Sequence, residues 1–284
     1  MTEPTAKSKP DSDDEWNSDD DDDEYSDWFQ SIRSPTGLEI GVKVTWPEVR
    51  ELTISTILEE AEIAPMFHGT QWAGTRVWRA AVVALQYLLL FQDNPGRLER
   101  RERLALTERI PAIGPETQIL ELGCGLGIPG ILLHEITKAS VVVSDMDSLV
   151  DQLKINLEKN FPTNLPDSER LQAHALDWSE KGVEDLLKNC DRTGKGFDIV
   201  LNCDCVYEPL YGRDAWVALV ACQKALIKAN PQTILMTSLE RRTADGVEDY
   251  LEAMRAVARV VEKIKVPFPH ASEVEVYLAY GLLE

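Results

Sequence analysis

The residues best placed to do chemistry surround a glycine-rich segment, ILELGCGLGIPG at residues 119–130. Gly123, Gly125 and Gly127 alternate with other residues there, after an apolar run and before a helical pattern with Pro129 near its start. Glycine lets the backbone turn sharply and approach a ligand closely, because it has no Cβ atom. The spacing therefore predicts a strand, a tight turn and a helix that hold a small molecule against the turn.

Acidic residues follow the next two apolar runs. Asp145 ends SVVVSD, 22 residues after Gly123, and Asp177 precedes Trp178 after RLQAHAL. A carboxylate at the carboxyl end of a strand can accept hydrogen bonds from both ribose hydroxyls of a nucleoside. Asp177 is suited to accept a bond from an adenine amino group, and the Trp178 indole can lie against the ring. Together these residues predict an adenosine-containing cofactor.

A further pair lies where the fourth apolar run ends. The segment FDIVLNCDCVYEP, residues 197–209, places Asp204 and Tyr207 three positions apart. In a parallel sheet this end lies on the same edge as the glycine turn. We therefore expect a carboxylate and a phenol beside the reacting group of the cofactor.

These segments, with GTRVW at 74–78 and LDW at 176–178, resemble the seven-β-strand protein-lysine methyltransferases known as methyltransferase family 16. The G-x-G-x-G form preceded by Glu121 is similar to the pattern of S-adenosylmethionine-dependent methyltransferases. The resemblance covers residues 38–284, with departures at Arg79, where proline is common, and at Cys124, where alanine is frequent. It implies S-adenosylmethionine as cofactor, with contacts from Trp78, Glu121, Gly123, Cys124, Gly125, Asp145, Asp177, Trp178 and Cys203.

The resemblance also implies an acceptor, a lysine side chain of a protein substrate. Methyl transfer from a sulfonium is an in-line displacement, so positioning and electrostatics should provide most of the acceleration. Our hypothesis is that Asp204 orients the incoming lysine, while Tyr207 bounds the channel and helps to hold the deprotonated amine. Desolvation in such a channel would lower the pKa of the lysine toward neutrality.

Specific residues favour or disfavour other functions. The Glu208-Pro209 extension and the Arg242–Asp245 stretch resemble a protein-arginine branch of the same family, so arginine is an alternative acceptor. A non-catalytic interaction module is a second alternative, and a small-molecule methyltransferase a third. A dehydrogenase is disfavoured because Ile128 replaces the last glycine of G-x-G-x-x-G. A nucleic-acid or glutamine-amide methyltransferase is disfavoured because residues 202–205 do not read N-P-P-Y.

The elements that must position these residues alternate regularly. From Thr117 onward, short apolar runs alternate with helical periods, which is typical of a parallel sheet with helices on both faces. We predict an α/β fold with a Rossmann-like seven-stranded methyltransferase sheet whose last strand is antiparallel. Before it, segments 38–45 and 51–58 predict a β-hairpin, and VWRAAVVALQYLLLF at 77–91 predicts a buried helix.

Composition limits the partners and the compartment. The chain of 284 residues carries 29 Lys and Arg against 49 Asp and Glu, a net charge of −20, which argues against nucleic-acid binding and favours a protein partner with a basic surface. Residues 1–35 are predicted to be a disordered acidic arm and residues 36–284 the methyltransferase domain. Five cysteines without ligand spacing predict a reducing compartment and no metal. We expect a monomer without membrane contact, in the cytoplasm or the nucleus.

Overall fold

The architecture is taken from a computed structural model of the chain. The described residues are 28–33, 35, 39–46, 51–55, 74, 77–90, 92, 110–162, 168–266, 268 and 271–283. Most of the predicted acidic arm, residues 1–27, lies outside them. Within the described part of the chain, no helix combines the length and the apolar character needed to cross a membrane.

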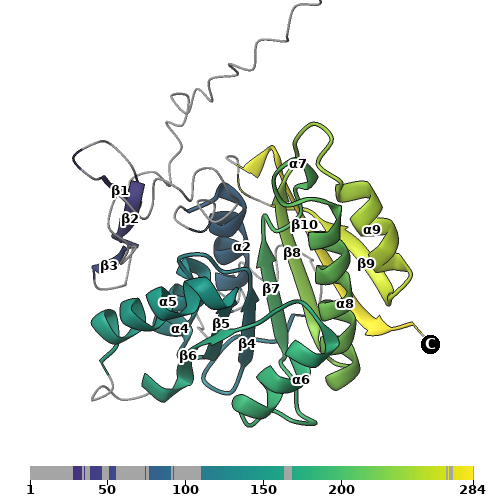
Figure 1. Ribbon diagram of the computed structural model, residues 1–284, viewed down its shortest axis with the longest axis horizontal. Coiled ribbons are helices and arrows are strands. Elements are labelled where there is room, and N and C mark those ends of the chain that lie inside the picture. The colour runs from purple at the N-terminus through teal and green to yellow at the C-terminus, as the bar shows by residue number, and fades with distance from the viewer. Residues whose placement is uncertain are drawn as a thin grey trace, which may run out of the picture.

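The centre of the molecule is a seven-stranded sheet with the order β6-β5-β4-β7-β8-β10-β9 (Figure 1). Its strands are β4 (Gln118–Leu122), β5 (Ser140–Asp145), β6 (Leu171–Ala175), β7 (Ile199–Cys203), β8 (Ile234–Glu240), β9 (Ala258–Ile264) and β10 (Val274–Leu282). The pairs among β4 to β8 are parallel, while β10 pairs antiparallel with both β8 and β9. The predicted mostly parallel sheet with an antiparallel last strand is confirmed.

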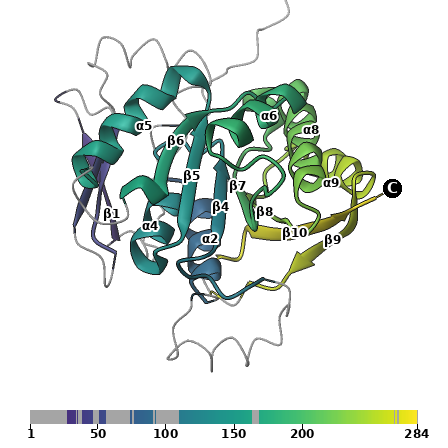
Figure 2. The same cartoon turned by 90° about the horizontal axis from the view of Figure 1, so that it is seen from below.

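Helices cover both faces of this sheet (Figure 2). They are α2 (Arg79–Leu89), α4 (Ile128–Thr137), α5 (Asp147–Asn160), α6 (Glu180–Asn189), α7 (Glu208–Tyr211), α8 (Arg213–Ala229) and α9 (Val247–Arg255), with a 3-10 turn at Ser168–Arg170. The apolar side chains of α2, α4 and α5 pack into one core, and those of α6, α8 and α9 pack into the other. The buried helix predicted at 77–91 is α2.

The alternation of side chains along each strand feeds both cores. In β4, Ile119 belongs to the core under α2 and α4, whereas Leu120 belongs to the core under α6 and α8. Val141 and Val142 of β5 divide in the same way. Because both faces are covered, these strands carry apolar residues toward both sides, with few polar residues such as Glu121 of β4 and Ser144 of β5. The buried strands are rigid supports for the loops that follow their carboxyl ends.

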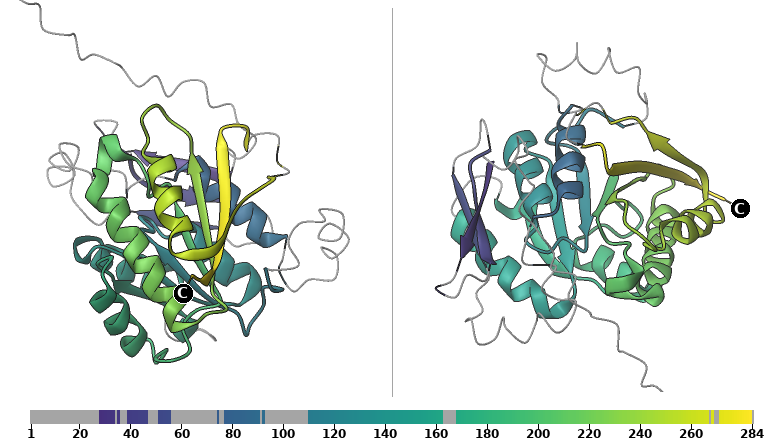
Figure 3. Two further views of the ribbon diagram at one scale, coloured as in Figure 1. Left: turned by 90° about the vertical axis from the view of Figure 1, so that its right-hand side faces the viewer. Right: turned by 90° about the horizontal axis from the view of Figure 1, so that it is seen from above.

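A small sheet of order β1-β2-β3 lies beside α5, on the outer side of the main sheet (Figure 3). The predicted hairpin is confirmed, because β2 (Glu39–Val44) pairs antiparallel with β3 (Leu52–Ser55). The side-chain amide of Asn160 donates a hydrogen bond of 2.9 Å to the Thr53 carbonyl and so links this sheet to α5.

The third strand, β1 (Phe29–Arg33), corrects the predicted arm boundary. It lies within residues 1–35, which the sequence analysis assigned to a disordered arm, yet it pairs antiparallel with β2. The physical reason is aromatic packing: the rings of Trp28 and Phe29 lie 4.6 Å and 6.0 Å, centroid to centroid, from the buried Trp46. This apolar contact offsets the entropy cost of ordering a segment whose neighbours along the chain are acidic.

Candidate functional site

A cavity of about 380 Å³ lies at the carboxyl ends of β4, β5, β6 and β7. Its size falls in the range of small-molecule sites. Of the residues predicted to bind the cofactor, every one lines it: Trp78, Glu121, Gly123, Cys124, Gly125, Asp145, Asp177, Trp178 and Cys203. Asp204, predicted to be catalytic, lines it as well, whereas Tyr207 does not. We call this cavity the first pocket.

The glycine turn forms one wall of the first pocket. Gly123, Gly125 and Gly127 have φ angles of 56°, 54° and 72°, in the left-handed region that favours glycine. A Cβ atom at Gly125 would lie 3.0 Å from the Gly74 Cα atom, and one at Gly123 would lie 2.8 Å from the Cys205 sulfur. The glycines are therefore required by both the backbone conformation and the space around the turn.

Asp145, at the end of β5, fastens the glycine turn. One carboxylate oxygen accepts a bond of 2.7 Å from the Gly125 N–H, and the other accepts one of 2.7 Å from the Met146 N–H. Burial raises the pKa of Asp145, and these two backbone bonds act in the opposite direction. Each carboxylate oxygen can accept a further bond, so Asp145 can still receive hydroxyl groups from a bound nucleoside.

Glu121 lies deeper in the same wall and is 2% exposed. Its Oε2 atom accepts a bond of 2.7 Å from the Gly130 N–H in the first turn of α4. Burial raises the pKa of Glu121 to about 8, and the nearby Asp145 contributes in the same direction. Glu121 thus carries a proton at neutral pH and connects β4 to α4.

Trp178 and Asp177 form an adjoining wall, after β6. The Trp178 ring packs against the glycine turn, since a Cβ atom at Gly123 would lie 3.1 Å from it. Asp177 is exposed, and its carboxylate accepts a bond of 2.8 Å from the Ser179 hydroxyl, which itself caps α6. An apolar ring beside an exposed acceptor at the rim suits an adenine base.

A second pocket of about 210 Å³ adjoins the first. The two share three lining residues, Trp78, Asp204 and Tyr211, so they meet at these side chains. The complete lining of the second pocket is Trp78, Asp204, Tyr207, Pro209, Leu210, Tyr211 and Arg242. Its wall is mostly aromatic and apolar, with one carboxylate and one guanidinium.

Asp204 is held rigidly between β7 and β8. Its N–H donates a bond of 2.8 Å to the Ser238 carbonyl, and its Oδ1 atom accepts one of 3.1 Å from the Glu240 N–H. Asp204 has a φ of 58°, a left-handed conformation that asparagine and aspartate adopt more readily than most residues. The carboxylate is 4% exposed and therefore needs a partner.

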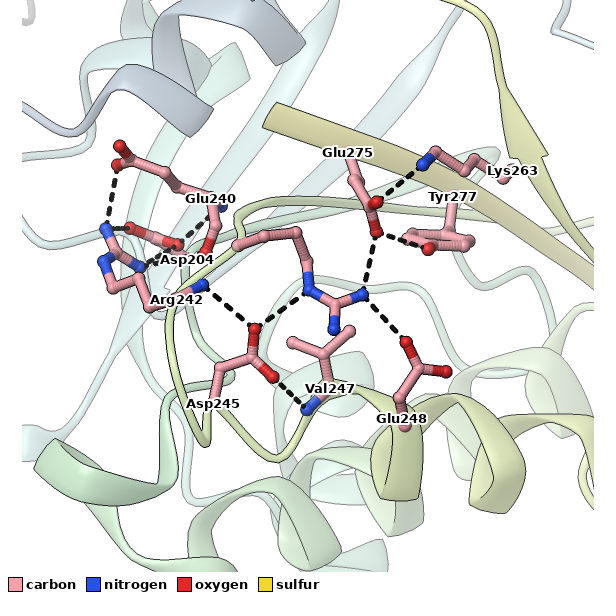
Figure 4. Close-up of polar contacts among 10 residues, drawn as sticks. Asp204, Glu240, Arg242, Asp245, Val247, Glu248, Lys263, Glu275 and Tyr277 are labelled. Atoms are coloured by element: carbon pink, nitrogen blue, oxygen red, sulfur yellow. Dashed lines mark hydrogen bonds and ion pairs between the residues drawn. The ribbon is translucent and has the colours of Figure 1, made fainter. Parts of the chain in front are cut away.

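That partner is Arg242, from the loop between β8 and α9 (Figure 4). The guanidinium donates a forked pair of bonds to Asp204, of 3.0 Å and 2.7 Å, and a third bond of 2.9 Å to the Glu240 carboxylate. Its carbon lies 5.6 Å from the ring centroid of Trp78 and 5.3 Å from that of Tyr207. The carboxylate predicted to orient the acceptor is therefore already engaged by a cation of the same chain.

The preceding residue, Arg241, extends into a different cluster. Its guanidinium bonds to Asp245 at 2.9 Å and to Glu275 of β10 at 3.1 Å. The Asp245 carboxylate in turn accepts a bond of 3.1 Å from the Arg242 backbone N–H. Figure 4 shows Asp245 and Glu275 on the far side of the loop from Asp204. The loop is thus fixed through Arg241 and Asp245 and presents the Arg242 side chain to the second pocket.

The sequence analysis missed Tyr211, Glu240 and the contact role of Arg242. Tyr211 lies in the short helix α7, which the pattern of apolar residues does not predict. Burial, followed by the nearby Cys205 and Asp204, raises the pKa of Tyr211, so its hydroxyl stays protonated. Glu240 ends β8, the strand next to β7. Its position at the carboxyl end of that strand is the signal by which the sequence could have identified it.

The cysteines near the site do not provide a nucleophile or a metal cluster. Burial raises the pKa of the Cys203 and Cys205 thiols well above the usual range, so both are neutral. Among the described residues no group of three or more His, Cys, Asp or Glu could hold a metal ion. The chemistry available here is the binding of a nucleoside and the positioning of a second reactant beside it.

Comparison with known proteins agrees with this geometry. A family model described as lysine methyltransferase matches residues 62–257. The chain is 29% identical to the human histone-arginine methyltransferase METTL23 over 170 residues, covering 60% of this chain and 72% of that protein. It is 26% identical to the calmodulin-lysine N-methyltransferase of Arabidopsis thaliana over 142 residues, covering 49% and 42%.

Two further matches are a secreted effector protein and a solved structure. The chain is 32% identical to the secreted RxLR effector protein 48 of Plasmopara viticola over 130 residues, covering 44% of this chain and 64% of that protein. The solved structure of human methyltransferase-like protein 13 in complex with SAH is 16% identical with a TM-score of 0.42, covering 71% of this chain and 82% of that one. The chain spans between 32% and 72% of the length of the curated relatives it matches. Because the family model matches more than half of the sequence, this chain belongs to the lysine methyltransferase family.

Proposed function

We propose that this S-adenosylmethionine-dependent methyltransferase modifies a lysine side-chain nitrogen of a protein. The observation that carries the proposal is the second pocket, which adjoins the first at Trp78, Asp204 and Tyr211. Its aromatic wall suits the aliphatic stem of a lysine, and its opening toward the first pocket suits delivery of the terminal nitrogen. The family description supports lysine as the acceptor.

The first pocket fits the cofactor. The glycine turn presents backbone without side chains to the cofactor, because Gly123 and Gly125 both line the pocket. Asp145 retains acceptor capacity for ribose hydroxyls, and Trp178 with Asp177 suits the adenine end. When bound, S-adenosylmethionine supplies an electrophilic methyl group on a sulfonium.

The residues of this chain act on the acceptor by positioning it. Trp78, Tyr207 and Tyr211 line the passage formed by the second pocket, and a lysine stem seated among their rings would displace water from it. Removal of water disfavours the ammonium form of a lysine and so favours the nucleophilic amine. Asp204 and Arg242 fix the polar end of the passage, and alignment of the amine there converts a bimolecular step into an effectively unimolecular one.

The charge of the chain supports a protein with a basic surface as the partner. The net charge of −20 attracts a basic protein over several ångströms, although salt screens this attraction. We propose that such a protein is met in the cytoplasm or the nucleus by a monomer of this chain.

The test is methyl transfer from radiolabelled S-adenosylmethionine into a whole-cell protein extract. The wild type is compared with Asp204→Asn, because asparagine tolerates the left-handed backbone at this position while the carboxylate is lost. Cofactor binding by both proteins is measured by calorimetry as a control. We expect discrete labelled bands that the variant loses, with methyllysine after hydrolysis. Absence of label from the wild type despite cofactor binding would overturn the proposal.

Arginine is the second candidate acceptor, and one observation favours it. The Arg242 guanidinium already lies between two carboxylates, Asp204 and Glu240, and close to the rings of Trp78 and Tyr207. A site that holds one guanidinium is chemically suited to exchange it for another. The similarity to a histone-arginine methyltransferase supports the same candidate. Methylarginine in the hydrolysate in place of methyllysine would establish it.

A further inference from the structure

The second pocket contains an apparent conflict if its acceptor is a lysine. Only the neutral amine has a free electron pair for attack on a methyl group. A buried carboxylate without a partner would stabilise the ammonium form and raise the pKa of the lysine. Asp204 lies at the junction of both pockets and is 4% exposed, so its charge acts in a poorly solvated space. Left alone, it would hold the acceptor in the unreactive form.

Arg242 removes this conflict by neutralising Asp204 directly. Its forked bonds of 3.0 Å and 2.7 Å use both carboxylate oxygens, and the arginine side chain itself is only 15% exposed. Burial opposes its charge, but the bonds to Asp204 and the nearby Glu240 raise the pKa of Arg242 above its usual value. The guanidinium therefore remains positive over the whole range in which an amine titrates.

Two further charged groups beside this pair, Glu240 and Arg79, balance each other. Glu240 adds a negative charge from the end of β8, and Arg79 of α2 lies 3.8 Å from it, with the exposed Glu273 on the outer side of Arg79. The remaining titratable groups that act on this corner are Tyr207, Tyr211, Cys205 and Asp145. Tyr211 and Cys205 stay protonated because burial raises the pKa of each, and Asp145 lies at the other end of the first pocket, bonded to the glycine turn.

We propose that Arg242 is a positioning residue of the acceptor site, which neutralises Asp204 so that the pocket receives lysine as its neutral amine and discriminates against the ammonium ion. This inference rests on the proposed lysine acceptor. It assigns Asp204 a role different from that of a cation-binding group: the carboxylate holds Arg242 in place. The proton of the acceptor is then lost to solvent before entry, because the site has no net negative charge to retain it.

The experiment measures binding of n-butylamine, a mimic of the lysine side chain, by saturation-transfer NMR between pH 7 and pH 9. The enzyme carries S-adenosylhomocysteine, so no methyl transfer takes place. A site that takes only the neutral amine binds about tenfold more tightly per pH unit, because the free amine fraction rises by that factor below its pKa. We expect this slope for the wild type and a nearly flat profile for Arg242→Gln, whose unpaired Asp204 attracts the ammonium ion.

Three further variants separate charge from architecture. Arg242→Lys keeps the positive charge without the fork and should keep the slope. The double variant Arg242→Gln/Asp204→Asn removes both charges and should regain the slope. Lys263→Gln removes an exposed cation that pairs with Glu275, away from Asp204, and should match the wild type. Glu121 titrates in the same range, but all the variants share it.

The outcomes are decisive in both directions. A wild-type slope in Arg242→Gln with weaker binding at every pH would assign Arg242 a structural role and overturn the inference. A flat profile for the wild type, or loss of the slope in Lys263→Gln, would also overturn it. Failure of the proposed function is seen separately, as absence of methyllysine in the labelling experiment, because the amine measurement needs no turnover.

Discussion

The two pockets hold their charged groups in different ways. In the first pocket, backbone N–H groups of the adjoining turns bind the carboxylates: Gly125 donates to Asp145 and Gly130 donates to Glu121. In the second pocket, the carboxylate of Asp204 is bound chiefly by a side chain, that of Arg242, from a different loop. The first arrangement fixes the shape of a pocket for a ligand that brings its own charge, whereas the second adjusts the charge that an incoming group meets.

This difference determines which substitutions disrupt each pocket. Backbone donors survive most substitutions, so the first pocket depends on the glycines that allow the turn. A side-chain pair can be broken by one substitution at either partner, and the buried group left behind is then costly. The predictions below separate the two pockets, beginning with the largest expected effect.

Loss of the Asp204 carboxylate should break the second pocket while sparing the first. For Asp204→Asn we expect turnover to fall by about 100-fold or more, a size typical for the loss of one preorganised electrostatic group. The backbone bond to Ser238 is kept, and cofactor affinity should change little. Single-turnover kinetics and calorimetric titration check the two parts. An equal loss in both measurements would mean that the two pockets are not separable.

A methyl group on the glycine turn should have the opposite effect. Gly125→Ala forces a residue with a Cβ atom to a φ of 54° and places that atom 3.0 Å from the Gly74 backbone. The left-handed conformation alone costs about 1–2 kcal/mol, so we expect cofactor affinity to fall at least about tenfold. Calorimetry measures it. Gly194→Ala is the matched control, because its φ is 73° with no atom within 4 Å. Affinity unchanged in Gly125→Ala would show that the turn adapts.

Loss of Arg241 should affect stability more than chemistry. Arg241→Gln removes bonds to Asp245, Glu248 and Glu275. Because the arginine is about one-third exposed and Asp245 is buried, we expect the free energy of unfolding to fall by about 1 kcal/mol, with turnover within about threefold. Urea denaturation checks this. Lys263→Gln, which removes an exposed partner of Glu275, should change stability by less.

A pH-dependent effect on stability concerns the buried Glu121. The folded-state pKa of about 8 lies above the reference value of 4.5, so the native state holds this proton more tightly than the unfolded chain. The contribution of Glu121 to stability is therefore complete below pH 4.5 and is lost as the pH rises through about 8. Glu121→Gln keeps an acceptor for Gly130 and should lose less stability than the wild type between pH 5 and pH 8. Equal losses in urea denaturation would refute the shift.

Every residue that the sequence predicted to bind the cofactor lines the first pocket, chiefly because these residues sit near strand ends. Asp145 and Trp178 follow apolar runs, and the chemistry of each type indicates an adenosine ligand. The same logic found Asp204 and Tyr207, both of which line the second pocket. It also set the end of the arm too late, because the aromatic contacts of Trp28 with Trp46 join segments that no local pattern links.

The order of strands and helices, the glycine turn and the acids at the sheet edge were determined by the sequence alone, because periodicity and glycine spacing act locally. The tertiary structure decided which charged side chain faces each pocket. Two adjacent arginines, Arg241 and Arg242, are equivalent in sequence, yet one binds Asp245 and the other Asp204. Their separation depends on how the loop after β8 packs between β7 and β10, and burial of Asp204 makes that packing a requirement: a carboxylate removed from water must find hydrogen-bond donors or a cation, wherever in the chain they lie.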